Sequence, residues 1–73
     1  MSEKITSMMA GNVWKVLVKK GDEVEEGDDI VILESMKMEI PVSSDVSGRV
    51  ESVDIEEGQF VNEGDVIVTI RVN

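Results

Sequence analysis

A lysine between two methionines, near the middle of the chain, is the residue whose setting is hardest to explain by folding alone. The segment reads Glu34-Ser35-Met36-Lys37-Met38, and residues typical of strands stand on both sides of it. If the flanking strands pair antiparallel, Met36 and Lys37 form a hairpin tip, where tight turns usually require glycine, asparagine or aspartate. A site that disobeys local turn chemistry is where a functional constraint can outweigh propensity. We therefore take Lys37 as the candidate functional residue.

The composition narrows the chemistry available to this lysine. The chain has 73 residues and contains no cysteine and no histidine, which excludes disulfides, thiol nucleophiles, Cys/His zinc sites and imidazole bases. A Schiff base at Lys37 would require a desolvated pocket, which a hairpin tip does not offer. Carboxylates are plentiful, but no spacing among them indicates an acid–base pair. We therefore expect a non-catalytic protein without a metal site.

Ordinary structural explanations compete with a functional one. A lysine in a turn is most often a solvated surface residue. Met36 and Met38 lie two positions apart, so on a strand they share a face, and a flexible thioether is a common core filler. Neither structural explanation covers the whole segment. The structural and the functional interpretation therefore both stay open at this point.

The charge and the apolar runs bear on partners and location. Sixteen acidic against seven basic side chains give a formal net charge of −9, which disfavours binding to nucleic acid and to acidic membrane surfaces. The first residues form no apolar signal segment, and the longest apolar run, Ile30 to Leu33, is far too short to span a bilayer. A 41% hydrophobic content rich in valine and isoleucine argues against disorder. We expect a folded, soluble, cytoplasmic protein that is monomeric when free.

An internal repeat gives the organisation that must position the lysine. Gly11–Glu34 aligns without a gap to Gly48–Arg71 at an offset of 37 residues, and ten of the 24 aligned positions are identical. The identical pairs are Gly11/Gly48, Val13/Val50, Val16/Val53, Gly21/Gly58, Val24/Val61, Glu26/Glu63, Gly27/Gly64, Asp28/Asp65, Ile30/Ile67 and Val31/Val68. Chance similarity between two valine-rich stretches would not place the glycines and the Glu-Gly-Asp triplet alike. We predict one domain over residues 1–73, with pseudo-twofold symmetry between half-repeats 11–34 and 48–71.

Each half-repeat has the residue types of strands joined by tight turns. Valine, isoleucine and threonine suit a pleated surface, while glycine and aspartate supply positive φ or local hydrogen bonds. The predicted turns are at Gly21-Asp22, Gly27-Asp28, Gly58-Gln59 and Gly64-Asp65, and no stretch predicts a helix. The sequence therefore predicts an all-β fold, with strands over Ile30–Leu33 and Ile67–Ile70.

Positions that are apolar in both copies are expected to form the core, because a symmetric interior makes similar demands on both halves. Trp14 is paired with Glu51 and Leu17 with Asp54. We therefore expect Trp14, the sole tryptophan, to be at least partly exposed. The opposing view is that a lone tryptophan in a small domain is usually buried.

Around the lysine the sequence resembles a known family. Glu34-Ser35-Met36-Lys37-Met38 is similar to the biotin-attachment motif of biotinyl domains, usually Glu-Ala-Met-Lys-Met, and the likeness extends from Ile5 to Val72. The stretch Val18–Asp28 resembles the one that precedes the modified lysine in biotinyl domains and in the related lipoyl domains. The resemblance implies a flattened β-barrel, the barrel-sandwich hybrid, made of two four-stranded sheets. It also implies that the modified lysine lies at the tip of a protruding hairpin.

The same resemblance implies a function and assigns residues to it. Biotin would be attached covalently to Lys37 by a biotin protein ligase. The residues recognised by the ligase or by partner enzymes would be Met36, Met38, Glu34 and Ser35. A biotinyl domain carries carboxybiotin from a biotin carboxylase to a carboxyltransferase, so cofactor and partners perform the chemistry. The chain is thus expected to be a carrier protein of a carboxylase system and not an enzyme.

The chain departs from the family pattern in two places. Many relatives have Ala-Pro-Met where this chain has Ser7-Met8-Met9, so a proline is missing. The two copies have equal length, which leaves no room for the thumb insertion of some bacterial acetyl-CoA carboxylase carriers. The chain therefore resembles the thumbless domains of pyruvate carboxylase and acyl-CoA carboxylase type.

Two alternatives to a biotin carrier remain. The first is lipoate, attached to the same lysine by a lipoyl ligase, because lipoyl domains share the scaffold. Lipoyl acceptors commonly have aspartate before the lysine and alanine after it, whereas Lys37 lies between methionines. The second is an unmodified interaction module. Its support is a charge inversion, since Lys19-Lys20 in the first copy occupy the places of Glu56-Glu57 in the second.

Overall fold

Residues 1–72 are described by the computed structural model, and they form strands joined by turns and loops. The strands are β1 (Ser2–Thr6), β2 (Gly11–Val16), β3 (Glu23–Val24), β4 (Asp29–Ser35), β5 (Met38–Ser43), β6 (Gly48–Val53), β7 (Phe60–Val61) and β8 (Val66–Val72). The all-β prediction is confirmed for this part of the chain, and the two strands expected from the sequence lie within β4 and β8. None of the described residues belongs to a helix of the length and apolarity needed to cross a membrane.

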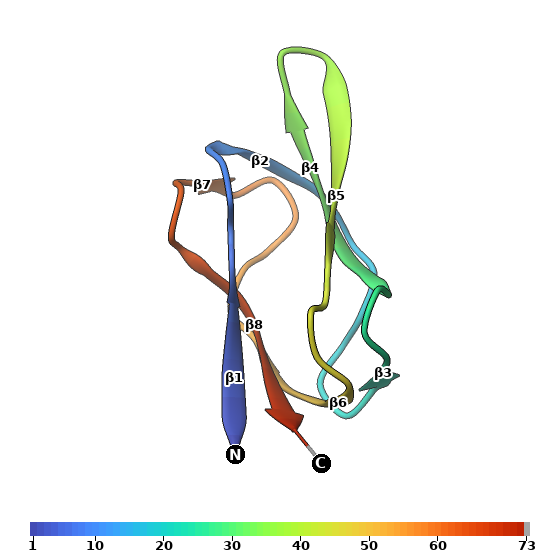
Figure 1. The fold of residues 1–73 in the computed structure, drawn as a ribbon. Coiled ribbons are helices and arrows are strands. Elements are labelled where there is room, and N and C mark those ends of the chain that lie inside the picture. The colour runs from blue at the N-terminus through green and yellow to red at the C-terminus, as the bar shows by residue number, and fades with distance from the viewer. Residues whose placement is uncertain (73) are drawn as a thin grey trace.

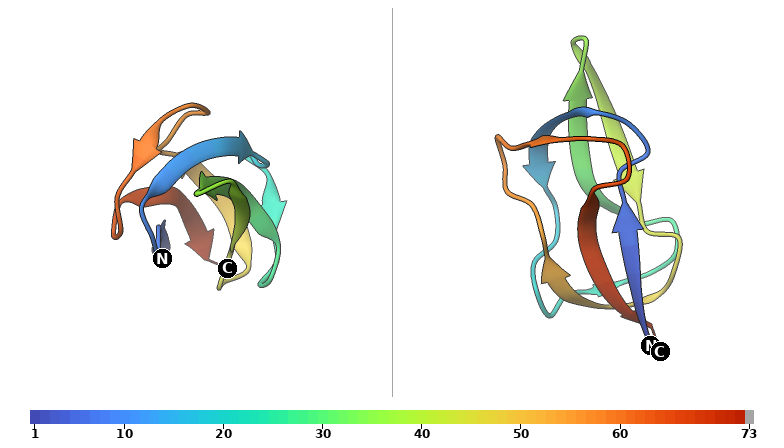
Figure 2. Two further views of the ribbon diagram at one scale, coloured as in Figure 1. Left: turned by 90° about the horizontal axis from the view of Figure 1, so that it is seen from above. Right: turned by 90° about the vertical axis from the view of Figure 1, so that its left-hand side faces the viewer.

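The strands form two antiparallel sheets of four strands each. The sheet with the order β5-β4-β2-β7 contains the central hairpin and is called the hairpin sheet, and the sheet with the order β1-β8-β6-β3 is called the terminal sheet (Figure 1). Seen from above, the strands curl around a shared interior (Figure 2, left). The molecule measures 36 × 17 × 17 Å, and the β4–β5 hairpin protrudes at the end far from both termini (Figure 2, right). The expected architecture is confirmed.

The two sheets are related by the sequence repeat. An offset of 37 residues maps β1 to β4 onto β5 to β8, and it converts the strand order of each sheet into that of the other. The correspondence extends beyond the half-repeats 11–34 and 48–71. Ile5 and Val42 are both buried, and so are Ser7 and Ser44. The pseudo-twofold symmetry therefore covers more of the chain than the gap-free alignment indicated.

Ser7 and Ser44 show how closely the halves correspond. The hydroxyl of Ser7 donates to the carbonyl oxygen of Met9, and that of Ser44 donates to the carbonyl oxygen of Val46. Their backbone N–H groups make matching bonds of 2.8 Å to the opposite half. Both hydroxyls are buried, and a buried hydroxyl requires such partners. The serine that departs from the family pattern at position 7 thus has a structural role, which its symmetry mate repeats.

The core consists of apolar positions shared by the two copies. Its buried members are Ile5, Val13, Val24, Ile30, Val31, Leu33, Val42, Val50, Ile55, Val61, Ile67, Val68 and Ile70. Trp14 is 41% exposed, as predicted, and Leu17 is 47% exposed. The strand register shifts around Trp14 on β2 and around Glu51 on β6, so each half carries a β-bulge at the same place. A bulge takes its residue out of the regular ladder, which explains why this pair is not in the core.

The four predicted glycine turns are all present. At each turn the glycine has a φ between 90° and 96°. The side chain that follows it accepts a hydrogen bond from the backbone N–H three residues before that side chain. In the first turn, for example, the N–H of Lys19 donates to the carboxylate of Asp22 at 2.9 Å. A left-handed backbone followed by an oxygen-bearing side chain is the turn chemistry read from the sequence.

Candidate functional site

The hairpin between β4 and β5 ends in a two-residue loop. Ser35 is the last residue of β4 to pair, and its partner is Met38. Met36 and Lys37 between them have φ angles of 52° and 64°. Positive φ at both central residues is what a type I′ turn requires, and such a turn matches the twist of the strands that it joins. The hairpin tip predicted at Met36-Lys37 is therefore confirmed as a structural feature.

This turn is made from residues that do not favour it. A left-handed φ brings the Cβ atom close to the following carbonyl oxygen and costs about 1–2 kcal/mol per residue. Met36 and Lys37 are the only residues other than glycine with a positive φ in the described chain. The β4–β5 ladder beneath them pairs six positions and holds the turn in place. Backbone strain that persists because the surrounding structure enforces it is typical of functional sites.

The tip side chains extend into solvent. Met36 is 91% exposed and Met38 is 62% exposed, and Lys37 is also exposed. The interpretation of the two methionines as core fillers is therefore wrong. The salt bridge found within residues 1–72 joins Arg49 to Glu23, so no carboxylate of this region pairs with the Lys37 amine. The tip presents a primary amine between two thioethers.

The other predicted site residues form the neck of the hairpin. Glu34 pairs with Glu39 across the two strands, and both are exposed, while Ser35 is half-buried. Like charges placed directly opposite each other destabilise a strand pair slightly, so this pair does not serve the fold. A Cβ atom on Gly11 would lie 3.0 Å from the carbonyl oxygen of Glu34 and 3.6 Å from the Cβ atom of Ser35. Gly11, known from the sequence only as a repeat position, thus lets β2 approach the neck closely.

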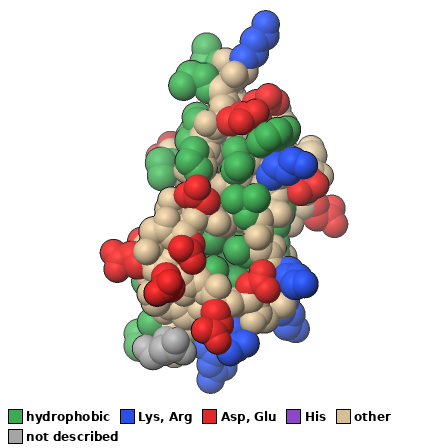
Figure 3. Space-filling view, turned by 90° about the vertical axis from the view of Figure 1, so that its right-hand side faces the viewer, with side chains coloured by type: hydrophobic (Ala, Val, Ile, Leu, Met, Phe, Trp, Pro, Cys, Tyr) green, Lys and Arg blue, Asp and Glu red, His purple; other side chains and the backbone are tan. Residues whose placement is uncertain are grey.

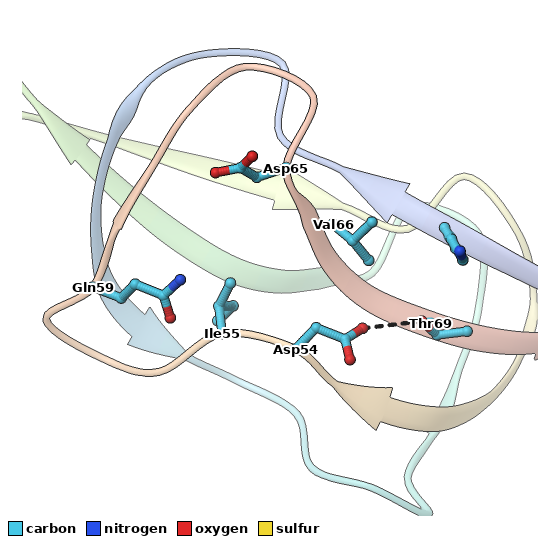
Figure 4. A pocket seen from close by; sticks show the side chains of 7 residues that line it. Asp54, Ile55, Gln59, Asp65, Val66 and Thr69 are labelled. Carbon is cyan, nitrogen blue, oxygen red and sulfur yellow. Dashed lines mark hydrogen bonds between the residues drawn. The ribbon is translucent and has the colours of Figure 1, made fainter.

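A pocket of about 430 Å³ lies on the terminal sheet, away from the hairpin (Figure 4). It is lined by Lys4, Asp54, Ile55, Gln59, Asp65, Val66 and Thr69. Several polar groups that line it already make hydrogen bonds within the fold, since Thr69 donates to Asp54 at 3.0 Å and the Gln59 side chain accepts the Glu56 N–H at 3.0 Å. Within residues 1–72, no cluster of three or more acidic, cysteine or histidine side chains could hold a metal ion. The pocket does not belong to the site around Lys37.

The charge inversion between the two copies has a structural component. The carboxylate of Glu57 accepts the backbone N–H of Val16 at 3.0 Å. Lys20, its counterpart, carries only hydrogen-bond donors and cannot make this contact. Part of the inversion therefore serves the packing of one turn against β2, which weakens it as support for an interaction module.

Comparisons with known proteins agree with this geometry. The biotin–lipoyl family model, described as biotin-requiring enzyme, matches residues 1–70. The chain is 58% identical over 41 residues to the biotin/lipoyl attachment protein of Bacillus subtilis, a match that covers 56% of each chain. It is 48% identical over 42 residues to biotinylated protein TB7.3 of Mycobacterium tuberculosis, covering 58% of this chain and 59% of the relative. The matches thus span little more than half the length of these curated relatives.

Solved structures extend the likeness to nearly the whole chain. A region of the urea carboxylase of Kluyveromyces lactis superposes with a TM-score of 0.91 at 35% identity, covering 97% of this chain and 6% of that one. A single-chain, multi-domain long-chain acyl-CoA carboxylase gives a TM-score of 0.92 at 26% identity, covering 99% and 7%. The chain corresponds to a small part of each of these large proteins. The comparisons bear out the resemblance stated from the sequence and, at the level of the family, the expected biotin.

Proposed function

The chain belongs to the biotin–lipoyl family of attachment domains, and from that premise we propose that it is a carrier protein biotinylated on Lys37. The observation that carries this proposal is the hairpin tip. Lys37 is an exposed lysine held in a left-handed turn that its own residue type disfavours. A strained backbone that presents one amine to solvent is explained by a reaction at that amine.

The attachment reaction suits an amine in this position. A ligase activates the biotin carboxyl group as an acyl-adenylate, and the Lys37 Nζ attacks the acyl carbon. The new amide bond forms as the bond to adenylate breaks, AMP leaves with the electron pair, and the amine gives up its proton. The protruding hairpin lets the amine enter a ligase site without unfolding of the carrier. Because the hairpin is rigid, binding orders little more than one side chain.

We assign recognition to the residues around the acceptor. Met36 and Met38 are exposed, flexible and polarisable, which suits contact with apolar recesses of a partner enzyme. Glu34 and Ser35 lie at the neck, where the Glu34 carboxylate adds negative charge close to the acceptor. In this assignment the tip provides the reactive amine and its two apolar anchors, and the neck provides charge.

The biotinylated carrier would transfer carboxybiotin from a biotin carboxylase to a carboxyltransferase. The likeness to urea carboxylase and to long-chain acyl-CoA carboxylase supports this role. Tethering raises the effective concentration of the reactive group at both enzymes. We further propose that residues 1–73 act as one domain, monomeric when free, in the cytoplasm where these partners meet it.

The proposal is tested by labelling with purified biotin protein ligase, biotin and ATP, followed by mass spectrometry with fragmentation. One biotinyl group on Lys37 is expected. The variant Lys37→Arg keeps the charge but removes the acylatable amine, so it should gain no label. Lys4→Arg, on the terminal sheet, is the matched control and should be labelled at the wild-type rate. Labelling of the Lys37→Arg variant, or an unlabelled wild-type protein, contradicts the proposal.

Lipoate on the same lysine is the second candidate, because the Bacillus subtilis relative is called a biotin/lipoyl attachment protein. The flanking residues offer a way to separate the two cofactors. Exchanging Met36 for Asp and Met38 for Ala should raise lipoylation relative to biotinylation when the protein is offered to each purified ligase. An unchanged ratio would show that the methionines do not determine the choice. Labelling by neither ligase would leave an unmodified interaction module.

A further inference from the structure

The two sheets differ in what they expose, although their backbones correspond. The outer face of the hairpin sheet, together with the residue that follows β2, carries a set of apolar residues that we call the apolar flank, namely Trp14, Leu17, Ile32 and Pro41. Their symmetry mates on the other side of the molecule are Glu51, Asp54, Thr69 and Lys4. One half of the duplicated scaffold therefore has apolar residues where the other has polar ones, of which Thr69 is buried and the other three are exposed.

Strand register places Ile32 and Pro41 of the apolar flank side by side. Ile32 pairs with Pro41 on β5 and with Lys15 on β2. Both neighbours of Ile32 in sequence are buried, so its own half-buried side chain faces outward. Trp14 precedes Lys15 at the bulge, and the Lys15 ammonium lies 5.5 Å from the centre of the Trp14 ring. Figure 3 shows hydrophobic side chains continuing downward from the hairpin on this side of the molecule.

The position of Leu17 follows from the symmetry. The backbone N–H of Leu17 and that of Asp54 each donate, at 2.9 Å, to the carbonyl oxygen of equivalent isoleucines. In the terminal sheet, the hydroxyl of Thr69 donates to the Asp54 carboxylate at 3.0 Å, so the side chains at these two positions meet. The equivalent pair in the hairpin sheet is Leu17 and Ile32. By this symmetry the apolar flank extends from Pro41 on β5 to Leu17, the residue that follows β2.

The fold does not require this face to be apolar. The terminal sheet reaches the same bulge, the same pairing and the same strand order with polar residues at the four equivalent positions. Contiguous apolar side chains on a solvent-facing surface mark interaction sites more often than they serve stability. The apolar flank is therefore best explained as an interaction surface, and its position relative to Lys37 indicates the partner.

We infer that the apolar flank is a docking surface for the ligase that acylates Lys37, an inference that rests on the proposed function. The two strands that carry the tip also carry Ile32 and Pro41, and Ile32 lies five residues, or roughly 17 Å of extended strand, from Lys37. Three tip side chains cannot supply the surface of about 800 Å² per partner that a standard protein interface buries. An enzyme that encloses the tip must therefore lie against a side of the hairpin.

Charge defines the chemistry of this partner. Glu34 and Glu39 stand between the tip and the apolar flank, and the whole chain carries a formal charge of −9. A complementary ligase surface has an apolar centre, to receive Trp14 and Leu17, and a rim of basic side chains toward its active site. The terminal sheet offers no comparable apolar centre, so docking is one-sided.

The symmetry provides the variant for a test. The triple variant Trp14→Glu, Leu17→Asp and Ile32→Thr gives each position the residue that its mate already holds on the same backbone geometry. The kcat/KM for biotinylation by purified biotin protein ligase should fall at least tenfold, through KM, with kcat changed less than twofold. Lys4→Glu on the terminal sheet changes the formal charge by the same amount and should alter kcat/KM less than twofold. Circular dichroism and a cooperative unfolding transition establish that each variant is folded.

The outcomes separate this inference from the proposed function. Labelling of the folded triple variant at the wild-type rate overturns the docking surface, while wild-type protein without label on Lys37 overturns the proposed function itself. If the triple variant is labelled normally but no longer accepts the carboxyl group from biotin carboxylase, the ligase assignment is also overturned. The apolar flank would then be a docking surface for the carboxylase. If the triple variant does not fold, Leu17→Asp alone should still lower kcat/KM about threefold at this half-exposed position.

Discussion

The two ends of the molecule are built from equivalent strand pairs, but only one of these pairs is joined by a turn. At one end β4 and β5 are joined by Met36 and Lys37, and at the other end β8 and β1 pair without a connection. There the N–H of Val72 donates to the carbonyl oxygen of Met1 at 2.7 Å, so the unlinked strands pair up to their ends. Pairing in this fold therefore does not depend on a good turn. The tip can hold residues that suit attachment, although they disfavour the turn.

The largest effect is expected when the hairpin tip is opened and the two original chain ends are joined instead. A circular permutant would begin at Met36, end at Ser35, and join the original ends with a short glycine linker. The strand pairs are unchanged, and closing one short loop while opening another alters the unfolding free energy by no more than about 2 kcal/mol. Biotinylation should fall at least 100-fold, because Lys37 would lie at a free strand end instead of a rigid tip. Mass spectrometry after incubation with ligase measures the label.

A second permutant controls for the linker and the new ends. It begins at Gln59 and ends at Gly58, in an exposed turn of the other half, and keeps the β4–β5 hairpin closed. It should be labelled at close to the wild-type rate. Equal labelling of both permutants would contradict the view that the closed tip is what the ligase requires.

Gly11 and Gly48 begin equivalent strands at opposite ends of the molecule. Replacing each by alanine should lower the unfolding free energy by different amounts. A Cβ atom on Gly48 would lie 2.2 Å from the carbonyl oxygen of Arg71, whereas one on Gly11 would lie 3.0 Å from that of Glu34. The first contact is with backbone and forces β6 and β8 apart, so Gly48→Ala should cost about 3 kcal/mol, against about 1 kcal/mol for Gly11→Ala. Urea denaturation of both variants measures the difference. Equal losses would mean that the two ends are packed alike.

The two buried serines, in contrast, should contribute equally to the stability of the protein. Ser7→Ala and Ser44→Ala each remove a hydroxyl that bonds a carbonyl oxygen two residues ahead. Each should lower the unfolding free energy by about 1–2 kcal/mol, with a difference below about 0.5 kcal/mol, since the surroundings are related by symmetry. Thermal unfolding of the two variants is the measurement. If only one of the two variants lost stability, the symmetry would hold for the strands but not for the loops that contain the serines.

Much of the fold followed from residues that the two copies share, because a symmetric core demands apolar side chains at pairs such as Val13 and Val50. The hairpin tip followed from the strand-forming residues on both sides of Met36 and Lys37, and the lack of turn-forming residues there singled out Lys37. The equivalence of Ser7 and Ser44 could not be predicted, because most residues around them differ between the two copies although the backbone repeats. The apolar flank could not be seen from the sequence, since only strand register shows that Pro41 lies beside Ile32.

The smallest expected effect concerns the turn itself. Met36→Gly relieves a left-handed residue of its Cβ atom and should stabilise the protein by about 0.5–1 kcal/mol, a gain limited by the extra freedom of glycine in the unfolded chain. Met8→Gly, at another exposed methionine without a positive φ, should give no gain. Denaturant unfolding compares the two. If Met36→Gly is more stable but is biotinylated more slowly, Met36 serves recognition although it disfavours the turn. If the variant is less stable, the methionine supports the hairpin, and the argument from backbone strain at Lys37 no longer holds.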